Sequence, residues 1–219
     1  MGAPLLDSGR VHLVFMDQTG LSSVRTCAEH VRSLSGGRLS IVFNNAAVMN
    51  TPEERSKDGF ELKFATNHLS HFLLLYLLKD ILLASSTPQF HSRVVSVSSS
   101  AHRYAPVQLD NINFGGIYNG WLAYGSSKTA NIYLTNQIDR LYGSQGSHGY
   151  SVRPGAFANP NLQKHSQEEV KASLGDARMQ KYLTGMEQAC ATSVYGAVSS
   201  ELEGKGGLYL EGASVAVHP

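Results

Sequence analysis

A tyrosine and a lysine lie four residues apart in the stretch WLAYGSSKTANIYL, which spans residues 121–134. Positions i and i+4 share one face of an α-helix, so Tyr124 and Lys128 are expected to point in the same direction. An ammonium group beside a phenol favours the phenolate and so lowers a pKa that is otherwise about 10. The pair could therefore exchange a proton near neutral pH. The same spacing also arises by chance on an amphipathic helix. The elements that position the pair must therefore decide whether it is functional.

The chain alternates between strand-like and helix-like stretches. Strands are predicted at 10–16, 39–43 and 93–97, at the start of 149–155, where the strand stops at Pro154 and Gly155, and at 207–212. Helices are predicted at about 21–34, 59–83, 121–143 and 186–199. Strands that alternate with long helices predict an α/β fold with a parallel sheet and helices on both faces. The 219 residues suffice for one domain with a substantial core, so a single domain over 1–219 is expected.

Polar or turn-forming residues follow each of the first four predicted strands. In chain order they are Asp17, then Asn44 and Asn45, then Ser98–Ser100, then Pro154 and Gly155. The carboxyl ends of parallel strands meet at one edge of a sheet, where ligands bind, so these residues are expected to converge. The Tyr124/Lys128 pair lies between the third and fourth of these strands, which makes chance a poor explanation of its spacing.

Composition excludes several classes of protein. Eighteen Lys and Arg against 17 Asp and Glu leave a formal net charge of +1, and no basic stripe indicates nucleic-acid binding. The two cysteines, Cys27 and Cys190, exclude a disulfide framework and favour a reducing compartment. The most apolar run, 72–78, is too short for a bilayer, which needs about 20 residues. A cytoplasmic protein with no membrane span is expected.

Five motifs, in order, resemble the short-chain dehydrogenase/reductase family from about residue 10 to the C-terminus. IVFNNAAVM resembles its Asn-Asn-Ala-Gly element, TNHLSHFLL the segment with its helix asparagine, RVVSVSSSAH its catalytic-serine segment, YGSSK its Tyr-x-x-x-Lys motif and RPGAF its Pro-Gly element. The branch is similar to retinol dehydrogenases, the WW-domain-containing oxidoreductase and fungal biosynthetic reductases. This resemblance implies a three-layer Rossmann-like sheet.

The resemblance also implies an oxidoreductase that uses NADP or NAD to interconvert a hydroxyl and a carbonyl on a small, apolar substrate. Tyr124 would be the general acid/base, Lys128 would lower its pKa and bind the nicotinamide ribose, Ser99 would hold the substrate oxygen, and Asn67 would anchor a water in the proton relay. The residues expected to bind the cofactor are Asp17 (at the adenine), Asn44, Asn45, Tyr124, Lys128, Pro154, Gly155 and Phe157.

One part of the family pattern has no match in this sequence. Relatives begin with a strand, a glycine-rich turn and a helix that hold the pyrophosphate, and a second strand then selects NAD or NADP. Since 10–16 resembles the family's third strand, the first β-α-β-α unit is missing, and impaired binding of the dinucleotide is expected. The stretch 10–16 is also expected to pair directly beside 39–43, because that would satisfy an otherwise open backbone edge.

Three interpretations stay open. The chain is a dehydrogenase/reductase whose sequence lacks its N-terminal segment, or a short protein without redox activity (an acid/base isomerase, a cyclase or a small-molecule binder), or a remnant or interaction subunit. Assembly into a homo-oligomer also stays open. A serine hydrolase based on Ser99 and His102 is disfavoured because no Gly-x-Ser-x-Gly turn occurs. No histidines pair at zinc-ligand spacing with a third ligand, so no metal is expected.

Overall fold

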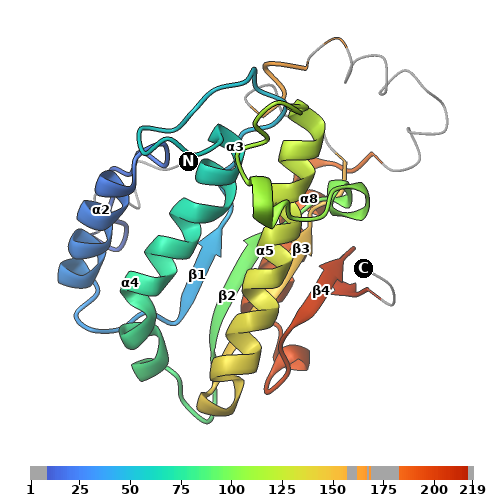
Figure 1. The fold of residues 1–219 in the computed structure, drawn as a ribbon. Coiled ribbons are helices and arrows are strands. Elements are labelled where there is room, and N and C mark those ends of the chain that lie inside the picture. Colours follow the sequence, from blue (N-terminus) through green and yellow to red (C-terminus); the bar gives the residue numbers. More distant parts are fainter. Residues whose placement is uncertain (1–8, 157–161, 167, 169–182, 217–219) are drawn as a thin grey trace.

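The computed structural model describes residues 9–156, 162–166, 168 and 183–216. Its α-helices are α2 (Leu21–Leu34), α3 (Leu62–Phe64), α4 (Ser70–Ala84), α5 (Gly120–Tyr142) and α8 (Met186–Val198). Its strands are β1 (Ile41–Asn44), β2 (Ser92–Val97), β3 (Ser147–Arg153), β4 (Leu208–Glu211) and β5 (Ser214–Val215). Short 3-10 helices lie at Ser100–Tyr104, Leu109–Asn111, Gly143–Gln145 and Ser200–Leu202, and a π-helical turn lies at Ala65–Leu69. Helices and strands alternate along the chain (Figure 1).

The strands form one sheet in the order β1-β2-β3-β4-β5. The first four strands are parallel to their neighbours, and β5 pairs antiparallel with β4. The parallel α/β architecture confirms the predicted fold class. Strand β5 was not predicted, because two residues carry no readable periodicity. The parallel strands share one carboxyl edge, so the polar residues that follow them meet there.

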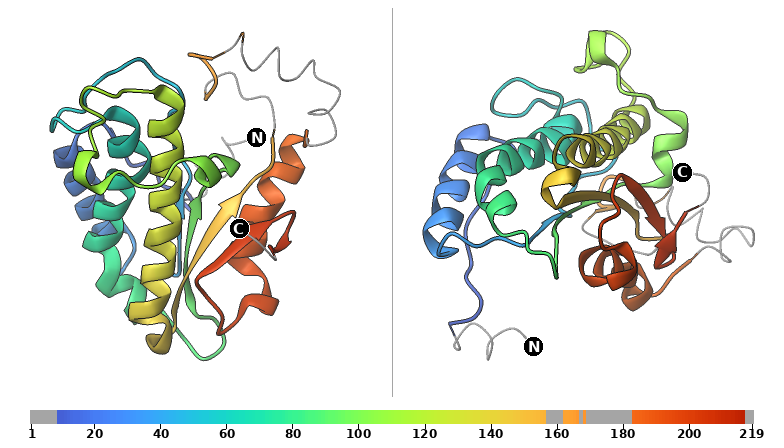
Figure 2. Two further views of the ribbon diagram at one scale, coloured as in Figure 1. Left: turned by 45° about the vertical axis from the view of Figure 1, so that its right-hand side comes forward. Right: turned by 90° about the horizontal axis from the view of Figure 1, so that it is seen from below.

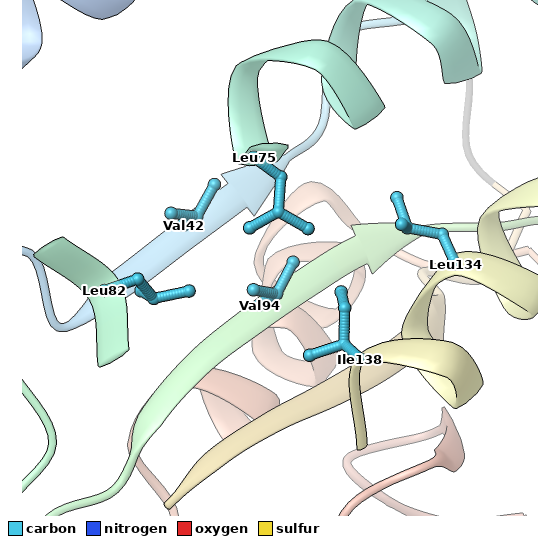
Figure 3. Packing of buried hydrophobic residues seen from close by; sticks show 6 residues of the cluster. All are labelled: Val42, Leu75, Leu82, Val94, Leu134 and Ile138. Atoms are coloured by element: carbon cyan, nitrogen blue, oxygen red, sulfur yellow. The ribbon is translucent and has the colours of Figure 1, made fainter. Parts of the chain in front are cut away.

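Helices cover both faces of the sheet. Viewed from below, α4 and α5 lie on one side and α8 lies on the other (Figure 2). All six residues of β2 are buried, as expected for a central parallel strand covered on both faces. The cluster under α4 and α5 consists of Val42, Val94, Leu75, Leu82, Leu134 and Ile138 (Figure 3). The cluster on the opposite face consists of Val95, Tyr150, Val152, Ala197, Leu202 and Leu210.

The strand predicted at 10–16 is wrong. Residues 11–17 have no regular secondary structure, and Leu13 and Phe15 are 82% and 83% exposed. Their alternation would suit a strand only beside a hydrogen-bonding neighbour, and β1 does not provide one. Within the described residues β1 pairs with β2 alone, so the predicted pairing of 10–16 beside 39–43 is also wrong. Strand β1 is therefore an open edge of the sheet within the described residues, and its Phe43 is 48% exposed.

The helix predicted at 59–83 is present as a continuous helical stretch through α3, the π-helical turn and α4. Glu61 caps its start by accepting a hydrogen bond from the Phe64 N–H at 2.7 Å. The buried Lys63 ammonium then pairs with Glu61 at 3.0 Å and donates to Thr51 Oγ1 at 2.9 Å. This beginning fixes the position of the next turn, which carries Asn67.

The longest described helix, α5, has 23 residues, which would suffice for a bilayer that needs about 20. Lys128, Asp139 and Arg140 interrupt its apolar character. No helix within the described ranges is both long and apolar enough to cross a membrane.

The close contact between β3 and α5 generates a stability prediction. A Cβ added at Gly149 would lie 2.3 Å from the Thr135 carbonyl oxygen and 2.8 Å from the Thr135 carbonyl carbon. Both are backbone atoms of α5, so Gly149→Ala is expected to lower the free energy of unfolding by about 1–3 kcal/mol. The measurement is urea unfolding followed by the fluorescence of Trp121. Gly115→Ala is the control, because its Cβ would meet only Asn111 Oδ1 at 3.7 Å. Equal losses in the two variants would contradict the packing described.

Candidate active site

Three elements bring the predicted catalytic residues to the carboxyl end of β2. Ser98 and Ser99 directly follow that strand, and Ser99 accepts a hydrogen bond from the Ala101 N–H at 3.3 Å as the cap of the next 3-10 helix. Tyr124 and Lys128 come from α5, and Asn67 comes from the π-helical turn. A hydrogen bond from the Ser98 hydroxyl to the Lys128 carbonyl oxygen, 2.9 Å long, ties α5 to the strand end.

Tyr124 is buried, and the side chain of Ser99 lies close enough to act on the pKa of its phenol. Burial raises the pKa of Tyr124 to about 12, although the Ser99 side chain opposes this rise. The expected lowering by Lys128 is therefore not seen, because loss of water around the phenol outweighs the effects of its neighbours. Gly125 allows the close approach, since an added Cβ would lie 2.7 Å from the Ala101 carbonyl oxygen.

Lys128 is also buried, and its Nζ lies 5.6 Å from the centroid of the Tyr124 ring. The two side chains share a face of α5, as their spacing predicted. Nζ donates to the carbonyl oxygen of Val97 at 2.9 Å. Burial lowers the pKa of Lys128 to about 7, so the ammonium and amine forms are both accessible near neutral pH.

Asn67 is fully buried and joins three segments. Its Oδ1 accepts from the Val48 N–H at 2.8 Å, and its Nδ2 donates to the Val48 carbonyl oxygen at 3.0 Å and to Ser127 Oγ at 2.9 Å. Ser127 in turn donates to the Tyr124 carbonyl oxygen at 2.7 Å. The Asn67 amide therefore ties the loop after β1 to the helix that carries Tyr124. Its role as a water anchor stays a prediction.

Three of the residues predicted to bind the cofactor, Asp17, Asn44 and Asn45, differ in their hydrogen-bond partners and in their exposure. The Asp17 carboxylate pairs with Lys57 at 2.7 Å and accepts from the N–H and hydroxyl of Thr19 at 2.9 and 2.7 Å. The hydrogen bond from Lys57, followed by those from Thr19, lowers the pKa of Asp17 to about 2. Asn44 is buried and donates to Ser96 Oγ at 3.0 Å, whereas Asn45 is exposed.

Pro154 and Gly155 follow β3, as predicted. Gly155 has a φ of 93°, which favours glycine, and an added Cβ would lie 2.7 Å from Thr184 Oγ1. The Thr184 N–H donates to the Ala156 carbonyl oxygen at 2.7 Å, which joins this turn to the segment before α8. Phe157 lies outside the described residues.

Two further aromatic residues lie near the site, and the sequence indicated only one of them, His102, beside Ser99. The ring of Tyr209 on β4 lies 5.0 Å from that of His102, and the charged form of Tyr209 would raise the pKa of Tyr124. In the sequence Tyr209 is part of a predicted strand, and no motif marks it. His102 Nδ1 lies 2.7 Å from the backbone carbonyl oxygen of Ser99. The ring thus bonds to the main chain of Ser99, which gives no support to a serine–histidine nucleophile.

Comparison with known proteins identifies the family of the chain. The family model for short chain dehydrogenase matches residues 5–170. The chain is 47% identical over 210 residues to short-chain dehydrogenase/reductase prx1 of Penicillium roqueforti, covering 95% of this chain and 61% of that protein. It is 34% identical over 209 residues to polyprenol dehydrogenase of Homo sapiens, covering 92% and 61%. The solved structure of NADPH-bound carbonyl reductase from chicken fatty liver gives a TM-score of 0.65 at 18% identity, covering 98% of this chain and 80% of that one.

The family model covers most of the chain, so the chain belongs to the short-chain dehydrogenase family. This confirms the resemblance stated from the five motifs. The chain spans 61% of the length of the two curated relatives named above. The likeness to carbonyl reductase shows a shared fold.

The Asn67 contacts generate a prediction. Asn67→Ala would leave the Val48 N–H and carbonyl without their side-chain partner, and each buried group left unpaired costs about 1–3 kcal/mol. The free energy of unfolding is expected to fall by that order, measured by denaturant unfolding. Asn136→Ala removes an exposed amide from α5 and serves as the control. Unchanged stability in Asn67→Ala would show that water replaces the amide.

Proposed function

We propose that this chain provides the acid/base groups of a nicotinamide-dependent dehydrogenase or reductase that interconverts a hydroxyl and a carbonyl. The observation that carries the proposal is the convergence of three side chains at the carboxyl end of β2. Ser99 acts on the phenol of Tyr124, and Lys128 Nζ lies 5.6 Å from the centroid of the Tyr124 ring and donates to the Val97 carbonyl oxygen. Two neighbouring hydroxyls can both form hydrogen bonds with one substrate oxygen. The relatives named above, a dehydrogenase/reductase and a dehydrogenase, support the same reaction class.

In the direction of reduction, Tyr124 would donate its phenolic proton to the substrate carbonyl oxygen while Ser99 donates a hydrogen bond to that oxygen. A pKa of about 12 keeps Tyr124 protonated at neutral pH, so the proton to be donated is present. In the direction of oxidation, Tyr124 must accept a proton, and a charged Lys128 would stabilise the phenolate. Since the pKa of Lys128 is about 7, that charge is present below about pH 7 and decreases above it.

Nicotinamide dinucleotide, when bound, would supply or accept the hydride. The residues present fit its nicotinamide-ribose end, because Lys128 and Tyr124 offer a cation and a hydroxyl beside each other. Asn44 adds a buried Oδ1 that has no hydrogen-bond partner within the described residues. The turn before α2, by contrast, contains a single glycine, Gly20, and does not resemble a glycine-rich pyrophosphate turn. We expect this chain to bind NADP or NAD more weakly than its longer relatives do.

The apolar surroundings of Tyr124 support a small, apolar substrate. The Tyr124 ring packs with the buried Met49 and Ala101. The partly buried Trp121 and Leu162 pack against this cluster. Trp121 meets the Tyr124 ring edge-on at 6.5 Å. Apolar side chains around one polar group are typical of pockets that orient an apolar ligand by its single functional group.

The second candidate is a protein that keeps the acid/base pair without redox chemistry, as an isomerase, a cyclase or a small-molecule binder. The engagement of Asp17 by Lys57 and Thr19 favours it, because that carboxylate is already occupied by partners within the chain. Both candidates need Tyr124, and only the first needs a dinucleotide. Calorimetric titration with NADPH and NADH therefore separates them.

The proposed proton transfer predicts the effect of Tyr124→Phe. Removing the phenolic hydroxyl is expected to lower turnover by about 10²- to 10⁴-fold, because the general acid is lost. The measurement is NADPH consumption in the presence of apolar aldehydes. Tyr133→Phe alters an exposed tyrosine of the same helix and should leave turnover unchanged. Full activity of Tyr124→Phe would place the proton donor elsewhere.

Lys128→Met is expected to weaken NADPH binding by roughly tenfold or more, since a charged hydrogen bond contributes about 1.5–3 kcal/mol. Titration calorimetry measures this directly. Lys205→Met, at an exposed position, is the matched control and should bind as the unmodified chain does. Equal affinities of the two variants would contradict a role for Lys128 in binding, and no binding of either dinucleotide to the unmodified chain would favour the second candidate.

A further inference from the structure

Lys128 shares its hydrogen-bond acceptor with another side chain of α5. Lys128 Nζ donates to the Val97 carbonyl oxygen at 2.9 Å, and Asn131 Nδ2 donates to the same oxygen at 3.2 Å. The two residues are 2% and 1% exposed. Residues three apart lie on one face of a helix, and a carbonyl oxygen has two lone pairs, so both donors can be accommodated. The carboxamide of Asn131 is therefore the polar neighbour of the ammonium at this oxygen.

The orientation of the Asn131 carboxamide is set from the other side by His68. Asn131 Oδ1 lies 3.2 Å from His68 Nδ1. Because Nδ2 is used as a donor to Val97, the atom that faces His68 is an acceptor, so His68 must carry its proton on Nδ1. The imidazole packs near the rings of Phe64 and Phe72, at centroid distances of 5.2 and 6.3 Å. Packing against the two phenylalanine rings thus orients the His68 imidazole, and the imidazole orients the Asn131 carboxamide.

The groups around Lys128 bring no opposite charge to it. Burial lowers the pKa of both His68 and His71 to about 4, so both are neutral at neutral pH. Tyr124, the other titratable group that faces Lys128, is protonated there. No carboxylate of the described chain contributes to the pKa of Lys128, which burial alone lowers.

We propose that Asn131 and His68 are positioning residues for Lys128. His68 holds the Asn131 carboxamide with its NH₂ group toward Val97 and its oxygen toward His68, which leaves the ammonium bound to one neutral carbonyl. The benefit of this arrangement for ligand binding by Lys128 rests on the proposed function. An ammonium held by a single neutral acceptor can move to a ligand hydroxyl, whereas an ammonium held by a carboxylate would stay paired. Position 131 therefore requires an amide and excludes the isosteric acid.

Asn131→Asp tests this directly, because it replaces the NH₂ group by an oxygen and changes little else in shape. An opposite charge within about 4–6 Å raises the pKa of an amine, so the titration midpoint of Lys128 is expected to rise by about 1 pH unit or more. The midpoint is read from the ¹³Cε shift of labelled lysine, and the signal that Lys128→Met removes identifies Lys128. Asn136→Asp puts the same charge on the exposed face of α5 and should leave the midpoint unchanged.

His68→Phe keeps an aromatic ring between Phe64 and Phe72 but removes the N–H that holds Asn131. The amide can then turn its oxygen toward Lys128, so the midpoint should rise, by less than in Asn131→Asp. A merely structural role of His68 would lower thermal stability without moving the midpoint. A midpoint that stays at its original value in Asn131→Asp overturns the proposal, and if that variant does not fold, an unchanged midpoint in His68→Phe does so. The titration uses neither substrate nor dinucleotide, so its failure is distinct from failure of the proposed function.

Discussion

The close packing of α5 against the sheet is the constraint on which the site depends. Gly149 lets the Thr135 backbone approach β3, and Gly125 lets the Tyr124 turn approach the segment after β2. The Ser98 hydroxyl then bonds to the Lys128 carbonyl oxygen across the same boundary. Such an approach leaves no room for water between the helix and the strand end, so the position of the helix determines how far the tyrosine and lysine lose their hydration.

This loss of hydration decides the electrostatics of the pair. Burial disfavours the charged form of each group, which raises the pKa of Tyr124 to about 12 and lowers that of Lys128 to about 7. A reading from spacing alone considers only the attraction between ammonium and phenolate and gives the opposite sign for the tyrosine. Because burial brings the pKa of Lys128 close to neutral pH, small changes in its polar surroundings decide whether it carries a charge.

The sequence predicted most of the parallel sheet and its helices, because short strand-like stretches such as Val94–Val97 alternate with long helical patterns. It failed at 10–16, where Val11, Leu13 and Phe15 alternate as in a strand but have no strand beside them. Apolar residues at every second position show that a segment could form a strand. Whether it does so depends on a neighbouring strand with which it can pair. The motifs located Ser99, Tyr124 and Lys128 at one strand end. The motifs could not show the hydrogen-bond partners of the Asn67 and Asn131 side chains, or that Tyr209 lies near the site. These contacts join residues that are distant in sequence.

The π-helical turn Ala65–Leu69 has a consequence for how this helix can vary. The Ser70 N–H bonds to the Ala65 carbonyl oxygen, five residues back, so the turn holds one residue more than a regular α-helix would. An α-helix advances by 3.6 residues per turn, and one added or deleted residue rotates everything beyond it by about 100°. Deleting a residue here would leave an unbroken helix in which Phe64 and His71 no longer keep their relative orientation. The extra residue sets the direction in which the side chains of α4 point. Insertions or deletions that a loop would tolerate would therefore turn every side chain of α4 away from its present contacts.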